Sequence, residues 1–409
     1  MCSLLENLTM KSFIISNIDS AIEFNGEIEA LHWVSEGDNQ WSAKTRQCGT
    51  WQCKIDFRSN GVITFTPSGV VPQAAKSLKL TLLHIPSIKA NHLLTQGISM
   101  GGCKAYKLQR CKDEEFTSSY TCSFSNEHET LMISSPLRQK QKVVMCGHTA
   151  HNEIKDFKVV FETNYHCNTV IEFDEVTMEA GEGIKLLDAY GEANSEKTED
   201  IKNIKTCGWN SWDYYRWTIT EEEVLKNAEF IRRDPVLSKH VKRIIIDDGW
   251  QYCYGEWEAN HHFHSGMEFL ARELTKMGFD PGLWLAPSII EPHSKIAQLD
   301  YDMLALTDSG QPCLGFECMQ RYGFLLDPTV KKTRDFLRDL FDKYSSYGYK
   351  LFKIDFLNST LSAPRFADSS VPRSMIIRKL IEPIYDGING RAEILACNHP
   401  FHAGAAMVD

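Results

Sequence analysis

The sequence predicts two architectures in one chain: an antiparallel β-sandwich, followed by repeated strand–helix units that form a parallel sheet, of the kind found in a (β/α)8 barrel or in an open doubly wound fold. Three observations predict this. Residues 1–190 hold short segments that alternate apolar with polar residues between turn-forming residues. Over residues 206–409, short apolar strands alternate with amphipathic helix patterns. Polar residues gather at the expected carboxyl ends of those strands.

The N-terminal half has the texture of a sandwich domain. It contains no convincing pattern for a long amphipathic helix, and its apolar residues recur with the period of two that strands require. The clearest strand segments are residues 61–71, 79–85, 128–135, 156–165 and 169–178. Residues 191–205 are polar and acidic and are predicted to form a linker between the two domains.

The C-terminal half reads as repeated strand–helix units. Thr220 with Glu223 predicts a capping box at the start of one helix, and Ser265 with Glu268 predicts a second, which ends at Gly278. Such repeats imply a parallel sheet, and the pattern leaves open whether it is a barrel or an open doubly wound sheet. The predicted strands are residues 205–212, 243–250, 281–287, 349–357 and 392–400.

Composition excludes several function classes. The 409 residues are 43% apolar and 24% charged, with a net charge of −10 and no basic stripe, so neither nucleic acid nor a membrane is an expected partner. No signal peptide is recognisable, and the 13 cysteines are scattered, which favours reduced thiols in the cytoplasm. No nucleotide-binding loop is present, and no cofactor is expected.

No metal site is expected either. The sequence contains no C-x-x-C pair. The run NHHFH at 260–264 falls in a predicted loop, where adjacent side chains do not share a face, so we interpret it as loop structure.

Adjacent carboxylates follow the strand RIII. Asp247 and Asp248 either form a strand-end turn or accept hydrogen bonds from the vicinal hydroxyls of a sugar. Aromatic residues near the same strand ends favour packing, with some available to cover the apolar face of a sugar. They are Trp209, Trp212, Tyr214, Tyr215, Trp217, Trp250, Tyr252, Tyr254, Trp257 and Trp284.

Lys353 and Asp355 lie on the same face of the buried strand LFKIDF. Buried charges are costly unless paired, so the two either neutralise each other or face a site. In a site, an aspartate kept ionised by the neighbouring ammonium group suits a nucleophile in glycoside chemistry. Cys397, at the end of another strand, is interpreted as packing because no catalytic histidine accompanies it in a recognisable motif.

Five motifs then carry a family resemblance. The runs GWNSWDYY, RIIIDDGWQ, GMEFLARELTKMGFDPGLWLAP, LLDPT and KLFKIDF occur in the order and spacing of α-galactosidases. The chain resembles glycoside hydrolase family 36, in the clan shared with family 27, over residues 205–409. The N-terminal half resembles the sandwich of that family only in kind. For residues 206–409 the resemblance implies a (β/α)8 barrel of the TIM type, of which about the first five units are present.

The resemblance implies a retaining glycoside hydrolase that releases terminal α-linked galactose from small oligosaccharides. Asp355 would be the nucleophile, and Lys353 would bind a hydroxyl group. Asp247 and Asp248 would bind the O4 and O6 hydroxyls. The other substrate-binding residues would be Trp212, packing on the sugar, Trp284 in the pocket wall, and Cys397 and Asn398 after the fifth strand.

Two departures from the family leave alternatives open. Asn398 and His399 stand where small or acidic residues are expected, so N-acetylgalactosamine or another sugar is an alternative to galactose. The general acid/base of the family is expected after Asp409, which is not itself assigned that role. We therefore expect a fragment or truncated frame. The competing functions are a galactosyltransferase on the same scaffold and a non-catalytic, vestigial sugar-binding protein. As to partners, a homo-oligomer is expected only for the full-length form.

Overall fold

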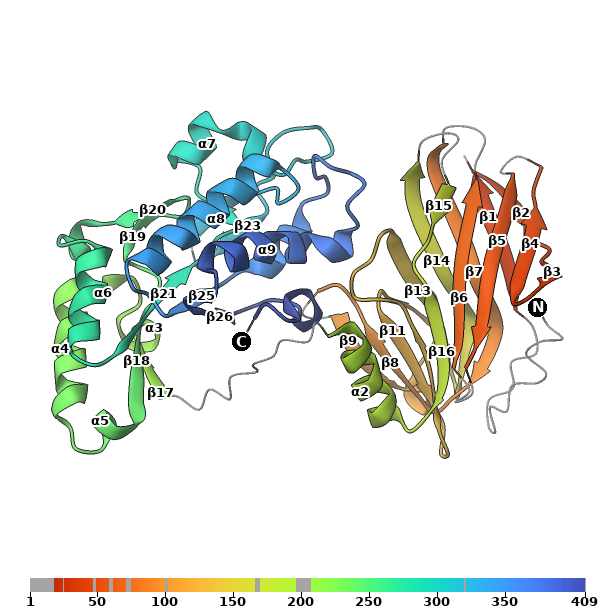
Figure 1. Cartoon of the computed structure of the whole chain (residues 1–409), viewed down its shortest axis with the longest axis horizontal. Helices are drawn as coiled ribbons and strands as arrows, with labels where there is room; N and C mark the ends of the chain where they lie inside the picture. The colour runs from red at the N-terminus through yellow and green to blue at the C-terminus, as the bar shows by residue number, and fades with distance from the viewer. Residues whose placement is uncertain are drawn as a thin grey trace. The chain divides into compact units, whose positions relative to one another are not determined.

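The computed structural model describes two compact units. One comprises Met1–Ser195 with Ser369–Met375, and the other Glu196–Asp368 with Ile376–Asp409 (Figure 1). No helix in the described part of the chain is long and apolar enough to cross a membrane. The described residues are 18–24, 26–46, 49–58, 62–70, 75–99, 102–165, 170–195, 207–319 and 321–408.

The first unit contains two antiparallel sheets, as the sequence predicts. A six-stranded sheet has the order β10-β13-β14-β7-β1-β2, and a ten-stranded sheet runs β3-β4-β5-β6-β16-β12-β11-β8-β9 with β15 beside β6. The strands are β1 Asp19–Phe24, β2 Glu27–Ala30, β3 Val34–Gly37, β4 Gln40–Lys44, β5 Thr50–Phe57, β6 Ile63–Val70, β7 Ala75–Lys89, β8 His92–Gln96, β9 Cys103–Lys107, β10 Glu114–Ser118, β11 Thr121–Ser125, β12 Thr130–Ser134, β13 Lys142–Ala150, β14 Glu153–Tyr165, β15 Val170–Glu172 and β16 Val176–Gly181.

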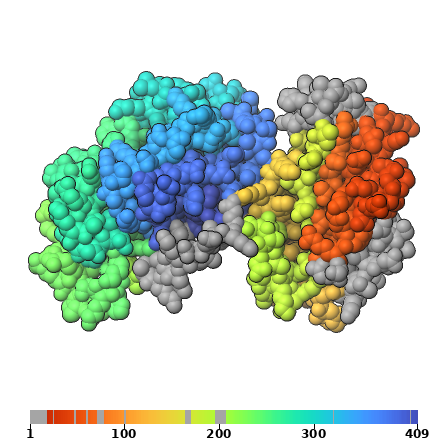
Figure 2. All heavy atoms as spheres, viewed as in Figure 1, coloured from red at the N-terminus to blue at the C-terminus, as the bar shows by residue number. Residues whose placement is uncertain are grey.

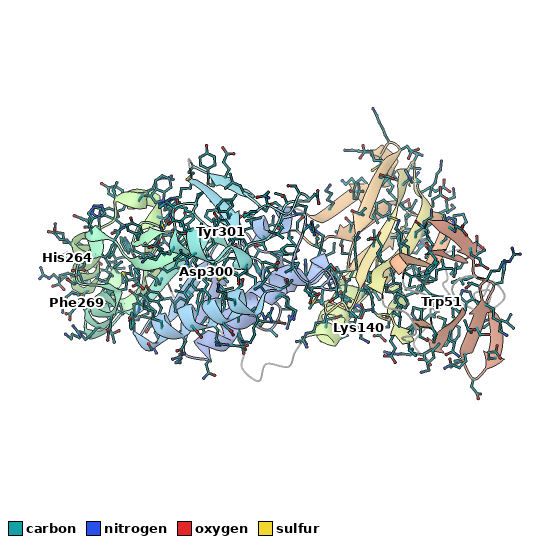
Figure 3. The ribbon with its side chains drawn as sticks, turned by 90° about the horizontal axis from the view of Figure 1, so that it is seen from above. Trp51, Lys140, His264, Phe269, Asp300 and Tyr301 are labelled. Carbon is teal, nitrogen blue, oxygen red and sulfur yellow. The ribbon has the colours of Figure 1, made fainter. Side chains whose placement is uncertain are left out.

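Side chains from both sheets form one core. Phe124 of β11 meets Phe157 of β14 edge to face, with ring centroids 5.0 Å apart. Trp51 of β5, marked in Figure 3, is fully buried in the same cluster. Alternate residues of strands such as β1, β5 and β13 are buried, which is why these segments show the period of two in the sequence.

Two details of the first unit differ from the sequence prediction. Residues 169–178 were expected as one strand, but they contribute to two, β15 and β16. Residues 191–194 of the expected linker are the last turn of helix α2, Gly183–Asn194. A hydrogen bond ties this helix to the segment after β12 of the ten-stranded sheet: the Tyr190 hydroxyl donates to the Ser135 carbonyl at 2.8 Å. The sequence pattern did not reveal this helix, because it buries no apolar stripe and Leu186 is its single buried residue.

The second unit is built on a five-stranded parallel sheet with the order β17-β18-β21-β25-β26. Each strand therefore lies beside the one before it in the chain, which is the order of a barrel; a doubly wound sheet reverses direction partway. The prediction of an incomplete TIM barrel is confirmed as a five-stranded half-barrel. The strands are β17 Cys207–Asn210, β18 Val241–Ile246, β21 Asp280–Leu285, β25 Leu351–Ile354 and β26 Glu393–Ala396.

Helices of this unit bury one face against the sheet. Apolar residues of α4, α6, α8 and α9 join those of the strands in a single core cluster, and the space-filling view shows their opposite faces at the surface (Figure 2). The helices are α3 Trp212–Tyr215, η3 Arg216–Thr218, α4 Glu221–Arg233, α5 Leu237–His240, η4 His261–Phe263, α6 Met267–Lys276, α7 Lys295–Leu299, η5 Tyr301–Met303, α8 Lys331–Ser346, η6 Leu357–Ser362, α9 Ile376–Ile388 and η8 Phe401–Gly404. The segments between the strands of the parallel sheet contain short antiparallel strands: β19 Gln251–Cys253, β20 Glu256–Ala259, β22 Ile289–Ile290, β23 Phe316–Cys318 and β24 Arg321–Leu325. Two further short helices, η2 Leu108–Arg110 and η7 Arg373–Met375, belong to the first unit.

The helix ends test the capping predictions. Thr220 caps α4 by accepting from the Glu223 amide at 3.2 Å, as predicted. The prediction for Ser265 is wrong, because α6 begins after Gly266 and the Ser265 hydroxyl donates to the carboxylate of Glu221 at 2.7 Å. Gly278 follows the end of α6 with a φ of +91°, a conformation that favours glycine and stops the helix as expected.

Candidate active site

The predicted site residues lie at the carboxyl ends of neighbouring strands. Trp212 follows β17, Asp247 and Asp248 follow β18, and Asp355 follows β25. Because parallel strands end at the same edge of the sheet, the fold gathers these side chains at one end of the half-barrel. Trp284 lies within β21, and Cys397 and Asn398 directly follow β26.

Asp247 is almost fully buried and pairs with Lys353. The Lys353 ammonium lies 2.7 Å from one carboxylate oxygen, Oδ2, and the Asn210 amide donates to the same oxygen at 2.8 Å. The backbone amide of Asp248 donates to Oδ1 at 2.9 Å. A carboxylate offers about four acceptor positions, so Asp247 retains about one for a further donor such as a sugar hydroxyl.

Of the two alternatives for Lys353 and Asp355, mutual neutralisation is not what the structure shows, because Lys353 pairs with Asp247 instead. The salt bridge joins Lys353 of β25 to Asp247 at the end of β18, and β21 lies between these two strands in the sheet. Burial lowers the pKa of Lys353, but the charge and hydrogen bond of Asp247 outweigh burial and raise that pKa above its ordinary value. The lysine is therefore a permanent cation beside the site at neutral pH.

Asp248 is the centre of a second network. Its Oδ2 accepts from the Trp217 indole and the Tyr254 hydroxyl, both at 2.6 Å, and its Oδ1 accepts from the Gln251 amide at 2.5 Å. The Arg321 guanidinium lies 3.9 Å from Oδ1. Burial nevertheless raises the pKa of Asp248 above its ordinary value. With three hydrogen bonds accepted, this carboxylate also has about one acceptor position left.

The two carboxylate oxygens of Asp355 differ in how many hydrogen bonds they accept. Oδ1 accepts from the Phe356 backbone amide at 2.8 Å and from the Asn398 side-chain amide at 3.0 Å. Oδ2 accepts only a longer bond, 3.3 Å, from the Trp284 indole among the described contacts. The carboxylate is thus oriented through Oδ1, which leaves Oδ2 better placed to react.

The backbone after Asp355 is strained. Phe356 has a φ of +59°, in the left-handed region that few residues other than glycine adopt. Its ring packs against Phe316, with centroids 4.9 Å apart, and against Trp284 at 6.2 Å. These contacts hold the turn that aims the Phe356 amide at Asp355, and such strain is typical of functional sites.

The remaining predicted residues border this cluster. Trp284 is buried in the core, with its indole NH at the edge of the site. Burial and then the charge of Asp355 raise the pKa of the Cys397 thiol, so it is protonated and weakly nucleophilic at neutral pH. Trp212 is partly buried, and the Arg216 guanidinium lies 5.2 Å from its ring centroid. Asp409 and the expected position of the acid/base lie outside the described residues.

Sequence reasoning missed Arg321 and Glu291. Arg321 Nη1 donates to Glu291 at 2.9 Å, and its guanidinium lies over the rings of Tyr254 at 4.6 Å and Trp217 at 5.2 Å. Glu291 directly follows β22, and Arg321 is the first residue of β24, the antiparallel partner of β22; neither residue stands in a recognisable motif. The only signal was the group of aromatic residues near the strand ends, to which Tyr254 and Trp217 belong.

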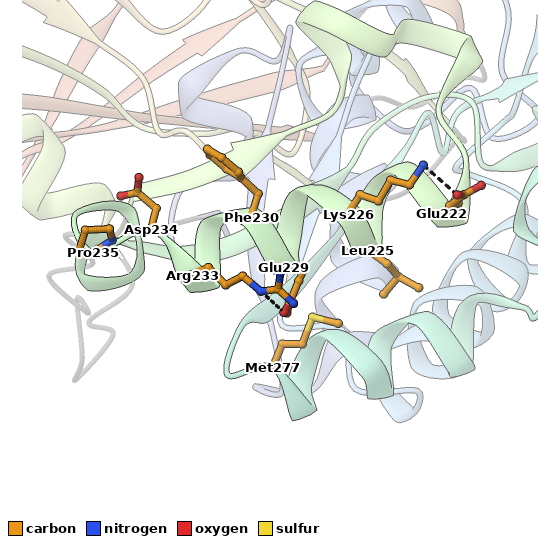
Figure 4. A pocket seen from close by; sticks show the side chains of 9 residues that line it. All are labelled: Glu222, Leu225, Lys226, Glu229, Phe230, Arg233, Asp234, Pro235 and Met277. Atoms are coloured by element: carbon orange, nitrogen blue, oxygen red, sulfur yellow. Dashed lines mark ion pairs between the residues drawn. The ribbon is translucent and has the colours of Figure 1, made fainter.

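A groove of about 790 Å³ lies elsewhere, on the outer side of α4 (Figure 4). Phe230, Leu225 and Met277 contribute its apolar lining, between the ion pairs that Lys226 and Glu229 make on the same helix. It contains none of the residues at the strand ends, so we do not assign it to the site.

Comparisons with known proteins agree with the fold. No family model matches the chain. A curated α-galactosidase of Schizosaccharomyces pombe is 35% identical over 83 residues, which are 19% of this chain and 19% of that protein. An Escherichia coli α-galactosidase is 24% identical over 145 residues, 33% of this chain and 19% of the relative. The matches thus span far less than two thirds of these relatives.

Solved structures match over most of the chain. TtGalA, an α-galactosidase from Thermus thermophilus in complex with p-nitrophenyl α-D-galactopyranoside, gives a TM-score of 0.64 at 17% identity, covering 90% of this chain and 73% of that one. AgaA, a family 36 α-galactosidase from Geobacillus stearothermophilus, gives a TM-score of 0.62 at 11% identity, covering 94% of this chain and 62% of that one.

The comparison with solved structures identifies first the architecture of the chain and then the family whose fold it has. A β-sandwich followed by a half-barrel is the architecture that this chain shares with the solved α-galactosidase structures that it matches. More particularly, this chain has the fold of the family 36 α-galactosidases, so the resemblance noted in the sequence is confirmed at the level of the fold.

Proposed function

We propose that the protein acts on terminal α-linked galactose in small oligosaccharides, through a retaining, double-displacement mechanism with Asp355 as the nucleophile. The observation that carries the proposal is the asymmetric holding of Asp355. Oδ1 is fixed by two donors while Oδ2 is left for reaction. A carboxylate on a rigid strand end, oriented in this way, is the nucleophile that retaining glycosidases require.

The proposed reaction has two displacement steps at the anomeric carbon. Oδ2 of Asp355 attacks the anomeric carbon, the bond to the leaving-group oxygen breaks, and that oxygen takes a proton from a general acid. Water then attacks the same carbon and gives its proton to the conjugate base, which releases Asp355 and the sugar with retained configuration. The resemblance puts this acid/base after Asp409, and no described residue is assigned to it.

The paired network supplies recognition. Lys353 donates, and Asp247 and Asp248 each retain about one acceptor position, so the three side chains offer a matched set of partners for adjacent hydroxyls. Arg321 and Tyr254 hold Asp248 in place. The structures of TtGalA include complexes with p-nitrophenyl α-galactoside and with stachyose. We therefore propose the same class of substrate here.

Trapping the covalent intermediate tests the proposal. We expect an aryl α-galactoside with a good leaving group to transfer one hexosyl unit to the chain, because such a leaving group needs little acid assistance. Peptide mapping by mass spectrometry should place the adduct on Asp355. The Asp355→Ala variant should show none, whereas a variant of an exposed aspartate, Asp386→Ala, should react like the wild type.

The outcomes separate the competing functions. An adduct that persists in Asp355→Ala, or that maps to another residue, would sink the nucleophile assignment. Galactose binding by calorimetry without any adduct would favour a sugar-binding protein. If an adduct forms, raising the concentration of an acceptor sugar distinguishes hydrolysis from galactosyl transfer by the product released.

A further inference from the structure

Three side chains with different metal-binding groups meet beside the Asp248 network. One ligand atom each from Cys253, Glu291 and His293 lies within 4.8 Å of the others. Cys253 and Glu291 are buried, whereas His293 is exposed at the surface. Neither the spacing of these residues in the sequence nor the run NHHFH predicted this group, because it joins strand β19 to the segment after β22.

The two segments are held rigidly against each other. The Tyr254 amide donates to the Glu291 carboxylate at 2.8 Å, and the Glu291 amide donates to the Tyr254 carbonyl at 2.9 Å. The Ser294 amide donates to the Glu291 carbonyl at 3.0 Å. Ser294 then caps helix α7 through its hydroxyl oxygen. The backbone on both sides of the ligand atoms is therefore ordered before any ligand binds, which lowers the entropic cost of binding.

The charges of this region are unbalanced. Asp248 and Glu291 are two buried carboxylates that share a single guanidinium, that of Arg321, at 3.9 Å and 2.9 Å. One negative charge is therefore left over in a region largely shielded from water. A divalent cation bound by a thiolate would add one net positive charge and restore neutrality, which is a favourable exchange at low dielectric.

We propose that Cys253, Glu291 and His293 form a binding site for a borderline-soft divalent cation of the Zn²⁺ class. Thiolate and imidazole select this class over Ca²⁺ and Mg²⁺, which take oxygen ligands. On binding, the Cys253 thiol gives its proton to solvent and a sulfur–metal bond forms without any change of oxidation state. The exposed position of His293 leaves the fourth coordination position to a water molecule.

The site is separate from the proposed catalytic residues. Glu291 is the link between them, because its Oε1 accepts from Arg321, which lies beside Asp248, and its Oε2 accepts from the Tyr254 amide. Binding of the cation is thus expected to stabilise the loops that carry the Asp248 network, whether or not the protein cleaves galactosides. The test can therefore be made by spectroscopy and unfolding, independently of activity.

Cobalt(II) serves as the spectroscopic probe. Titration of the metal-free full chain with Co²⁺ should produce the near-ultraviolet absorption of a thiolate–cobalt bond, and added Zn²⁺ should remove it. Cys253→Ser should abolish this band. His293→Ala, a change at an exposed position, should weaken binding by at least about 10–100-fold, the loss that even outer-sphere partners of a metal cause. Zn²⁺ should raise the Tm of the wild type but not that of Cys253→Ser.

Matched variants make the result specific. Cys313→Ser removes another buried thiol of the same unit, and His264→Ala removes another exposed imidazole; both should bind Co²⁺ like the wild type. Circular dichroism checks that each variant is folded. A band that survives in Cys253→Ser, no band in the wild type at millimolar Co²⁺, or unchanged affinity in His293→Ala would overturn the proposal.

Discussion

Replacing Lys353 by methionine would leave Asp247 buried without its counter-charge. The Lys353 and Asp247 side chains are 16% and 3% exposed, and their charged atoms are 2.7 Å apart. Removing one partner of such a buried pair typically costs about 3–5 kcal/mol, because the remaining charge is left desolvated. We expect the free energy of unfolding of Lys353→Met to fall by about this amount at neutral pH. Methionine retains most of the side-chain volume, which limits the contribution of a cavity.

Urea denaturation followed by tryptophan fluorescence measures this loss. Lys343→Met is a matched control, because Lys343 and Glu258 are also 2.7 Å apart but are 34% and 71% exposed. Such a surface pair contributes about 0.2–1 kcal/mol. If Lys353→Met unfolds within about 1 kcal/mol of Lys343→Met, the argument that Asp247 depends on the lysine for its counter-charge is refuted.

The same pair predicts a pH dependence with a definite sign. The pKa of Lys353 in the folded protein is raised above its ordinary value of 10.5. A group whose folded pKa is raised contributes its full stabilisation below the unfolded pKa and loses it as the pH rises through the folded pKa. The stability difference between the wild type and Lys353→Met should therefore be constant at neutral pH and narrow above about pH 10.5. A difference that widened in alkali would contradict the assignment.

Three further changes test other contacts. Asn398→Ala removes a donor that orients Asp355, so the rate of adduct formation should fall about 10–100-fold, while circular dichroism should show an unchanged fold. An unchanged rate would mean that the Phe356 backbone amide is enough to orient the Asp355 carboxylate. Tyr254→Phe deprives the buried Asp248 of a hydrogen bond and should cost about 1–3 kcal/mol in urea denaturation, and a neutral result would show that water replaces the hydroxyl. Thr220→Ala removes the cap of α4 and should lower stability by about 1 kcal/mol, whereas a Thr220→Ser variant should retain most of it.

Much of the fold was predictable because it rests on local patterns. The period of two in the first half and the apolar strands of the second correspond to observed strands, and Thr220 caps its helix as predicted. Ser265 shows the limit of such reasoning. It had the sequence of a cap, but a buried carboxylate 44 residues earlier in the chain, Glu221, binds its hydroxyl instead. Local signals fail where a distant partner offers a stronger hydrogen bond.

The sequence by itself determined which residues stand at the strand ends, since a parallel strand–helix repeat delivers Asp247, Asp248 and Asp355 to one edge of a sheet. It did not determine the partners of these residues. Lys353 pairs with Asp247, 106 residues away, and not with Asp355, which directly follows the strand of Lys353. The Arg321 network and the Cys253 group likewise join segments that are distant in the chain. Only the tertiary structure decides such pairings, because Coulomb and hydrogen-bond energies depend on distance in space and on burial, which sequence separation does not encode.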